Sequence, residues 1–279
     1  MIKIALTGST GLIGSRIIEL LEKDFEFIPL LQTQVDITNK DQITNAINEI
    51  DFDYFLHLAA YTNVDATEQN KDLVQKINVE GTRNVFETVQ KKNKQFIHIS
   101  TDFVFDGSKP PYLENSTPQP VSFYAQTKYD AEQIVKDKAM IIRLSYPYRA
   151  KYDLKKDFVK SIVSLLKEQK TIQMVTDSLM TPTFIDDIAF AFKYLVLHFD
   201  KKIYHIVGSD SISPFNSGKL IAQKFHLDES LVQPITFKTY FQNKAKRPQY
   251  SDIKTKNNIF YKMKTFEQGL DEILKQLQS

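Results

Sequence analysis

Hydrophobic residues follow two different spacings in the first half of the chain. Five short runs are almost entirely apolar and indicate buried strands, at residues 1–6, 26–31, 52–58, 95–100 and 140–144. Between them, apolar residues recur every three or four positions, which predicts helices from about residue 12 and at residues 39–50, 71–92 and 124–137. Strands that alternate with helices of this length form a parallel sheet covered on both faces. The pattern therefore predicts an α/β fold with a doubly wound parallel sheet.

The spacing is less regular in the second half of the chain. It predicts helices at residues 158–170, from Asp186 and Asp187 onward, and near 217–225 and 265–277, with strands at 171–175 and 203–207. The two aspartates at a helix start are suited to the positive end of its dipole. No internal repeat or low-complexity linker divides the chain.

We therefore expect two interleaved parts rather than two separate domains. The dinucleotide-binding domain is expected over residues 1–150, with a later return at approximately 184–207. A smaller C-terminal substrate-binding lobe is expected over residues 151–183 and 208–279.

Three of the eight glycines lie directly after the first strand, at Gly8, Gly11 and Gly14. A strand, a glycine turn and a helix in this order place backbone N–H groups and a helix N-terminus against a pyrophosphate. The spacing is Gly-x-x-Gly-x-x-Gly, and a purely structural turn is the alternative. The concentration of glycine favours a Rossmann-like dinucleotide site.

The ends of the next two strands lie where the cofactor is expected. An acidic residue after the second strand favours NAD and an arginine favours NADP, but the chain has glutamine and threonine at residues 32–34. Asp36 and Ile37 follow, either at the site or in a turn. The small residues at 59–60 permit close approach of a ligand or of a helix. Asn78, in an apolar helical stretch, is either a core residue or a support for the site.

The fourth strand leads to Thr101 and then to a helix with Tyr124 and Lys128 on one face. Tyrosine is a poor proton donor at neutral pH because its pKa is roughly 10. We expect the lysine ammonium to lower the pKa of the phenol and make it a general acid. Thr101 is placed to hold a substrate oxygen beside the phenol. Right-handed crossovers bring all these segments to one edge of the sheet, and residues 107–120, with four prolines, form a loop nearby.

Composition excludes several other classes of function. With 42% hydrophobic and 25% charged residues, a net charge of +2 and no apolar run of about 18 residues, we expect a cytoplasmic protein without nucleic-acid or membrane partners. There are no cysteines, so disulfides and thiolate catalysis are excluded. The five histidines lack metal-ligand spacing, and His57, His98 and His205 are expected to be satisfied core residues, so no metal is expected.

Across nearly its full length the chain resembles the extended short-chain dehydrogenase/reductases, and among them the dTDP-4-dehydrorhamnose reductase family. The resemblance rests on the three glycines, Asp36-Ile37-Thr38, the segment from Ala59 to Asp65, the segment from Ser100 to Gly107, and Tyr124-x-x-x-Lys128. Pro182-Thr183 and Arg247-Pro248-x-x-Ser251 match weaker signatures in the second lobe.

The resemblance implies an NAD(P)H-dependent oxidoreductase of dTDP-rhamnose and carbohydrate biosynthesis that acts on a nucleotide-linked 4-keto-6-deoxysugar. Its implied catalytic residues are Thr101, Tyr124 and Lys128. Its implied contacts to NADPH or NADH are Gly8, Gly11, Leu12, Ile13, Asp36, Ile37, Ala59, Ala60, Tyr61, Thr62, Tyr124 and Lys128. Its implied contacts to the sugar nucleotide are Thr101, Asp102, Phe103, Tyr146 and Arg247. A homodimer is one oligomeric state that the sequence leaves open.

Three positions near the implied sugar pocket depart from the family pattern. Phe103 replaces a tyrosine, Tyr146 a tryptophan and Met180 a glycine. An epimerase or a reductase of another nucleotide sugar suits these changes. A second alternative is a non-catalytic dinucleotide-binding protein resembling the regulatory subunit of methionine adenosyltransferase, which also keeps a Tyr-x-x-x-Lys.

Overall fold

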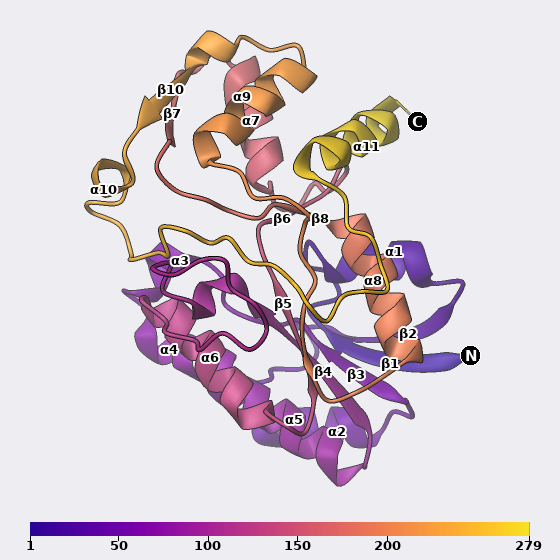
Figure 1. The fold of residues 1–279 in the computed structure, drawn as a ribbon. Coiled ribbons are helices and arrows are strands. Elements are labelled where there is room, and N and C mark those ends of the chain that lie inside the picture. The colour runs from indigo at the N-terminus through magenta and orange to yellow at the C-terminus, as the bar shows by residue number, and fades with distance from the viewer. Residues whose placement is uncertain (279) are drawn as a thin grey trace.

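The computed structural model describes residues 1–278, and its centre is a parallel sheet of six strands (Figure 1). The strand order is β2-β1-β3-β4-β5-β9, and every neighbouring pair is parallel. The strands are β1 (Ile2–Thr7), β2 (Phe25–Leu30), β3 (Tyr54–His57), β4 (Gln95–Thr101), β5 (Met140–Leu144) and β9 (Ile203–His205). The order runs outward from β1 in both directions, so the predicted doubly wound fold is confirmed.

Helices cover both faces of this sheet. One face packs against α1 (Gly14–Leu21) and α8 (Ile185–Leu197), which contact each other and bury Ile17, Leu21 and Phe192. The other face packs against α2 (Lys40–Asn48), α5 (Thr82–Lys91) and α6 (Phe123–Val135). Strand residues alternate between the two cores, which explains the nearly continuous apolar runs in the sequence.

The second lobe lies at the carboxyl end of the sheet, at the top of Figure 1. It holds two small parallel pairs, β6 with β8 and β7 with β10, and its own core around Tyr148, Phe266 and Leu270. Its elements are β6 (Pro147–Tyr148), α7 (Phe158–Lys167), β7 (Ile172–Val175), β8 (Thr183–Phe184), α9 (Pro214–Lys224), β10 (Val232–Ile235), α10 (Phe237–Tyr240) and α11 (Phe266–Gln278). The residue boundaries expected for the two parts stay a prediction.

The single helix predicted over residues 71–92 is interrupted. The structure has α4 (Lys71–Gln75), a π-helical turn (Lys76–Gly81) and then α5. The π turn contains Asn78, whose amide bonds the backbone N–H of Tyr61 at 2.8 Å and the hydroxyl of Thr127 at 3.0 Å. A π-helical turn inside an α-helix often marks a functional site. Asn78 therefore ties the helix to a loop at the carboxyl end of the sheet.

The elements missed by the sequence pattern are short. β6, β8, β10, α10 and α3 (Val64–Thr67) contain between two and four residues each. Such lengths hold too few residues for a spacing to show. Among residues 1–278, no helix is long and apolar enough to cross a membrane.

Candidate active site

A cleft of about 930 Å³ opens at the carboxyl end of the central sheet. The glycine turn, the loop after β3, the end of β4 and the start of α6 line it together, as the sequence predicted. Every residue expected to bind cofactor or to act in catalysis lies in this lining. Of the residues expected to contact the sugar, it includes Thr101, Asp102, Phe103 and Tyr146, whereas Arg247 lies outside.

The glycine turn is held so tightly that two of its glycines admit no side chain. Gly8 has a φ of +72°, in the left-handed region that favours glycine. A Cβ on Gly14 would lie 2.3 Å from the carbonyl oxygen of Gly8. The N–H of Gly11 closes the turn by donating to that same oxygen at 3.0 Å. The start of α1 therefore sits close to the end of β1, and residues 11–14 line the cleft. A helix N-terminus in this place fits a pyrophosphate.

A buried chain of hydrogen bonds supports the wall next to this turn. The Thr82 hydroxyl donates to the carbonyl of Asn78 at 2.7 Å, so it accepts from His57 Nε2–H at 3.1 Å. His57 Nδ1 then accepts from the Thr7 hydroxyl at 2.8 Å, and Thr7 accepts from the N–H of Ala59 at 3.3 Å. Burial lowers the pKa of His57 to about 3, with Lys128 adding to the effect. His57 is thus a neutral link between β1, β3 and the π-helical turn.

The expectation of satisfied core histidines holds for His57 and His205 but is wrong for His98. Among the described residues, neither ring nitrogen of His98 has a hydrogen-bonding partner, and its ring stacks on His57 at 5.7 Å. Burial lowers the pKa of His98 well below its usual value, so the ring is neutral. The sequence could not reveal this difference. His98 lies in an apolar strand just as His57 and His205 do, and the strand pattern does not show which of them has a hydrogen-bonding partner.

Tyr124, Thr101 and Lys128 meet at the inner end of the cleft. The Ser122 hydroxyl caps α6, and the tyrosine and lysine lie one helical turn apart on its buried face. The Tyr124 phenol is within hydrogen-bonding reach of Thr101. The Nζ of Lys128 donates to the carbonyl of Ile99 at 2.8 Å.

The predicted lowering of the Tyr124 pKa by Lys128 is wrong for this structure. Burial and the nearby Asp102 raise the pKa of the phenol, so Tyr124 keeps its proton at neutral pH. Burial lowers the pKa of Lys128 to about 8, so the lysine is protonated at neutral pH. The side chains sit where the spacing placed them, but removal from water dominates the ionisation of both.

Asp102 is a buried carboxylate that joins three segments of the chain. It accepts hydrogen bonds from Thr101 at 3.0 Å, from Ser145 at 2.9 Å and from Ser251, which lies far away in sequence. Burial raises the pKa of Asp102, and the three hydroxyls oppose that effect. Ser145 and Ser251 therefore fix the carboxylate beside Thr101.

Aromatic side chains form the wall of the cleft around Phe103. The rings of Tyr124 and Tyr146 both lie about 6 Å from the ring of Phe103, at 6.0 and 6.2 Å. Arg247, expected here, instead pairs with Asp65 at 2.8 Å. Asp65 lines a second hollow of about 850 Å³ between α3, the start of α6 and residues 243–246. The Arg247 charge still acts on Tyr146, whose pKa it lowers against a larger rise caused by burial.

The opposite end of the cleft is lined by Leu31, Gln32, Asp36 and Ile37. Asp36 closes a local turn by accepting from the N–H and the hydroxyl of Thr38, both at 2.9 Å. It thus combines the two alternatives left open by the sequence, since it forms a turn and also lines the cleft. Among the described residues that line the cleft, no arginine is present.

Two cleft residues had no signal in the sequence. Tyr152 and Lys155 reach the cleft from the segment between β6 and α7, which belongs to the second lobe. Only the tertiary structure brings this segment to the glycine turn. No group of three or more histidine or acidic residues in the described chain is arranged to hold a metal ion.

A family model described as the RmlD substrate-binding domain matches residues 2–279. The chain belongs to this family. It is 30% identical over 268 residues to a dTDP-4-dehydrorhamnose reductase from Aggregatibacter actinomycetemcomitans, covering 90% of both chains. A solved dTDP-4-dehydrorhamnose reductase from Bacillus anthracis, in complex with NADP, matches with a TM-score of 0.92 and 32% identity over 99% of this chain and 100% of that one.

A second solved relative of the RmlD family agrees with this assignment. A dTDP-4-dehydrorhamnose reductase ortholog from Clostridium acetobutylicum matches with a TM-score of 0.91 and 28% identity, over the whole of both chains. The family resemblance expected from the sequence motifs is therefore confirmed.

Proposed function

We propose that this protein is an NAD(P)H-dependent reductase of a nucleotide-linked 4-keto-6-deoxysugar, in the manner of dTDP-4-dehydrorhamnose reductases. One observation carries the proposal: a glycine turn shaped for a pyrophosphate and a Thr101, Tyr124 and Lys128 cluster line one continuous cleft. The family relationship names the sugar class. The product carries a CH–OH group where the substrate carried a ketone, which places the enzyme among the oxidoreductases that act on such groups.

The residues along the cleft from the glycine turn to Lys128 would hold the cofactor. The N–H groups of Leu12 and Ile13, at the start of α1, would bind its pyrophosphate, and a Cβ on Gly14 would collide with the Gly8 carbonyl of this turn. Asp36 and Ile37 would hold its adenosine, and the loop after β3 would hold its nicotinamide half through Ala59, Ala60, Tyr61 and Thr62.

Reduced nicotinamide supplies the hydride to the sugar keto carbon. Tyr124 then donates its phenolic proton to the oxygen that develops negative charge, and its raised pKa means that this proton is present at neutral pH. Thr101 holds the same oxygen by a hydrogen bond. Lys128 is charged at neutral pH and binds the ribose next to the nicotinamide. Phe103 and Tyr146 pack on the sugar, while Arg247 pairs with Asp65, which lines the neighbouring hollow.

The direct test mixes purified protein with dTDP-4-dehydrorhamnose and either NADH or NADPH, and follows the loss of reduced-nicotinamide absorbance. We expect turnover, and we expect Tyr124→Phe to lower kcat by at least about a hundredfold because general acid catalysis contributes on this scale. Tyr129→Phe is the matched control, since Tyr129 lies on the same helix, packs against the hydrophobic cluster that contains Tyr112 and Val207, and does not line the cleft.

Two outcomes of this assay other than turnover would each favour a different alternative function. Exchange of hydrogen isotope without net consumption of cofactor identifies an epimerase. Bound cofactor without turnover on a panel of 4-keto sugars would contradict the reductase and favour a non-catalytic role. The cytoplasmic location and the homodimer stay predictions from the sequence, to be checked by fractionation and by light scattering.

A further inference from the structure

Residues 150–157, between β6 and α7, contribute Tyr152 and Lys155 to the lining of the cleft; we call this segment the strap. The hydroxyl of Tyr152 donates to the carbonyl of Thr10 in the glycine turn at 2.6 Å. Three residues later, Nζ of Lys155 lies 3.5 Å from Oγ1 of Thr62, in the loop after β3. The strap therefore reaches from one wall of the cleft to the other.

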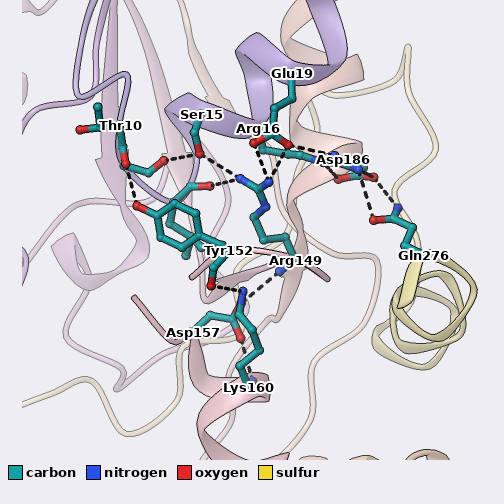
Figure 2. A network of polar contacts seen from close by, with 12 residues as sticks. Thr10, Ser15, Arg16, Glu19, Arg149, Tyr152, Asp157, Lys160, Asp186 and Gln276 are labelled. Atoms are coloured by element: carbon teal, nitrogen blue, oxygen red, sulfur yellow. Dashed lines mark hydrogen bonds and ion pairs between the residues drawn. The ribbon is translucent and has the colours of Figure 1, made fainter. Parts of the chain in front are cut away.

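The strap is held in this position at its carboxyl end. The Asp157 side chain accepts from the N–H of Arg149 at 3.2 Å and from the N–H of Lys160 at 2.9 Å. Lys160 also donates to the carbonyl of Tyr152 at 3.4 Å. The Tyr152 ring lies within cation–π distance of both Arg149 and Lys160, at 5.4 and 5.6 Å. Figure 2 shows these contacts orienting the Tyr152 hydroxyl toward Thr10.

Arg149, just before the strap, ties it to the helix that forms the glycine turn. The side chain is buried, and its guanidinium donates to Ser15 at 2.9 Å and to both carboxylate oxygens of Glu19 at 2.6 and 2.8 Å (Figure 2). A further contact reaches the carbonyl of Leu12 at 3.4 Å. Because both Arg149 and Tyr152 bond this region, the strap and the glycine turn keep a fixed separation.

Among residues 1–278, Lys155 has no acidic partner and makes one weak contact, with Thr62. Among the described residues that line the cleft, Lys128 and Lys155 are the two basic ones. Lys128 lies at the inner end, bonded to Ile99. Lys155 is exposed, and its 3.5 Å contact with Thr62 is at the limit of a hydrogen bond. A dinucleotide pyrophosphate carries two negative charges and sits at the glycine turn, within the span of the strap.

We propose that Lys155 binds the pyrophosphate of the cofactor, and that Tyr152 is a positioning residue that holds the strap over it. The proposal rests on the cofactor location given under the proposed function. The substrate lobe then supplies one wall of the cofactor site, and the dinucleotide is held between α1 and the strap.

The test compares Lys155→Met with Lys156→Met. Lys156 is the next residue and is also exposed, but it donates to Ser164 at 2.8 Å and does not line the cleft. It is therefore a matched control for the loss of one positive charge. Dissociation constants for NADH, ADP and adenosine are measured by calorimetry or by competition at several salt concentrations. We expect Lys155→Met to weaken the binding of NADH and ADP by about tenfold and to leave the binding of adenosine unchanged. We also expect the dissociation constants of NADH and ADP to depend less on salt concentration in this variant.

Two results would overturn this role for Lys155. One is a change of less than about twofold in the ADP and NADH constants. The other is an equal loss for adenosine, because that would show a general effect on the fold. Lys156→Met is expected to match the wild type with all three ligands, and a tenfold loss there would also count against the proposal.

Tyr152 is tested by a double-mutant cycle. Tyr152→Phe removes the bond to Thr10 and keeps the ring, and we expect it to weaken ADP severalfold. If Tyr152 acts through Lys155, the same change made in Lys155→Met adds less than about twofold. If Tyr152→Phe lowers the affinity for ADP by the same factor in the Lys155→Met variant as in the wild type, Tyr152 does not position Lys155.

These measurements need no sugar, so they separate the two proposals. Binding that depends on Lys155 in a protein without sugar turnover would overturn only the assigned reaction. A wild-type protein that binds neither NADH nor NADPH would overturn both.

Discussion

Burial changes the ionisation of Lys128 enough to matter near physiological pH. Its pKa is lowered to about 8, because removal from water outweighs the effect of Glu132, which raises it. The lysine is therefore charged below about pH 8 and loses its charge as the pH rises through that value. The charge of Lys128 therefore depends on pH in a range that its spacing from Tyr124 does not predict.

We expect NADH to bind more weakly above about pH 8, because an uncharged Lys128 holds the ribose hydroxyls less well. The measurement is the dissociation constant of NADH from about pH 6 to about pH 10. Lys128→Met serves as the control. We expect it to bind NADH more weakly than the wild type, with a dissociation constant that does not change in this pH range. A wild-type constant that stays flat to pH 10 would contradict the role given to Lys128.

We expect the end of the cleft around Asp36 to determine the choice between NADH and NADPH. Gln32 and Asp36 line it, and no basic residue of the described lining lies there. A 2′-phosphate would gain no ion pair and would lie near a carboxylate. We therefore expect NADH to bind at least as tightly as NADPH, measured by titration of both. Tighter binding of NADPH by more than tenfold would show that another group recognises the phosphate.

At the scale of elements, α6 carries both Tyr124 and Lys128, and a buried ion pair fixes it to β5. The guanidinium of Arg143 donates to the two carboxylate oxygens of Glu132 at 2.9 and 2.6 Å, and both side chains are 2% exposed. Removing one partner of such a pair leaves an uncompensated buried charge.

We expect Glu132→Gln to lower the free energy of unfolding by about 3–5 kcal/mol. Glu87→Gln breaks the exposed pair with Lys40, and we expect it to change the free energy of unfolding by less than about 1 kcal/mol. Urea denaturation of both variants is the measurement. If the two variants change the free energy of unfolding by similar amounts, the ion pair of Glu132 with Arg143 does not hold α6 in place.

On the scale of the whole molecule, the two lobes meet directly at Asp102. Ser251 comes from the long C-terminal segment and donates to Asp102, next to Thr101. At the other side of the cleft, Arg149 bonds Glu19, while Arg16 donates to Gln276 of α11 at 3.2 Å (Figure 2). Contacts on both sides therefore set the width of the cleft.

Ser251→Ala tests the contact at Asp102. Each hydroxyl stabilises the carboxylate and lowers its pKa, so removing one raises the pKa further. We expect the acid limb of the kcat profile to move up by about one pH unit, with the NADH dissociation constant unchanged. An unchanged acid limb would show that Asp102 does not titrate in the catalytic range.

Much of the first half of the fold could be predicted because its signals are local. The strand before the glycine turn, the helix with Tyr124 and Lys128 and the strand ending at Thr101 each follow from apolar spacing over a few residues. The helix over residues 71–92 was predicted without its π-helical turn. The reason is that Asn78 finds its partners, Tyr61 and Thr127, in distant segments.

By itself, the sequence determined the sheet, the glycine turn and the residues gathered at its carboxyl edge, because chain order and handedness leave few other arrangements. Tertiary structure alone decided the raised pKa of Tyr124, the pairing of Arg247 with Asp65 and the arrival of Lys155 at the cleft. These depend on burial and on contacts between residues far apart in the chain. Neither can be read from the spacing of neighbours.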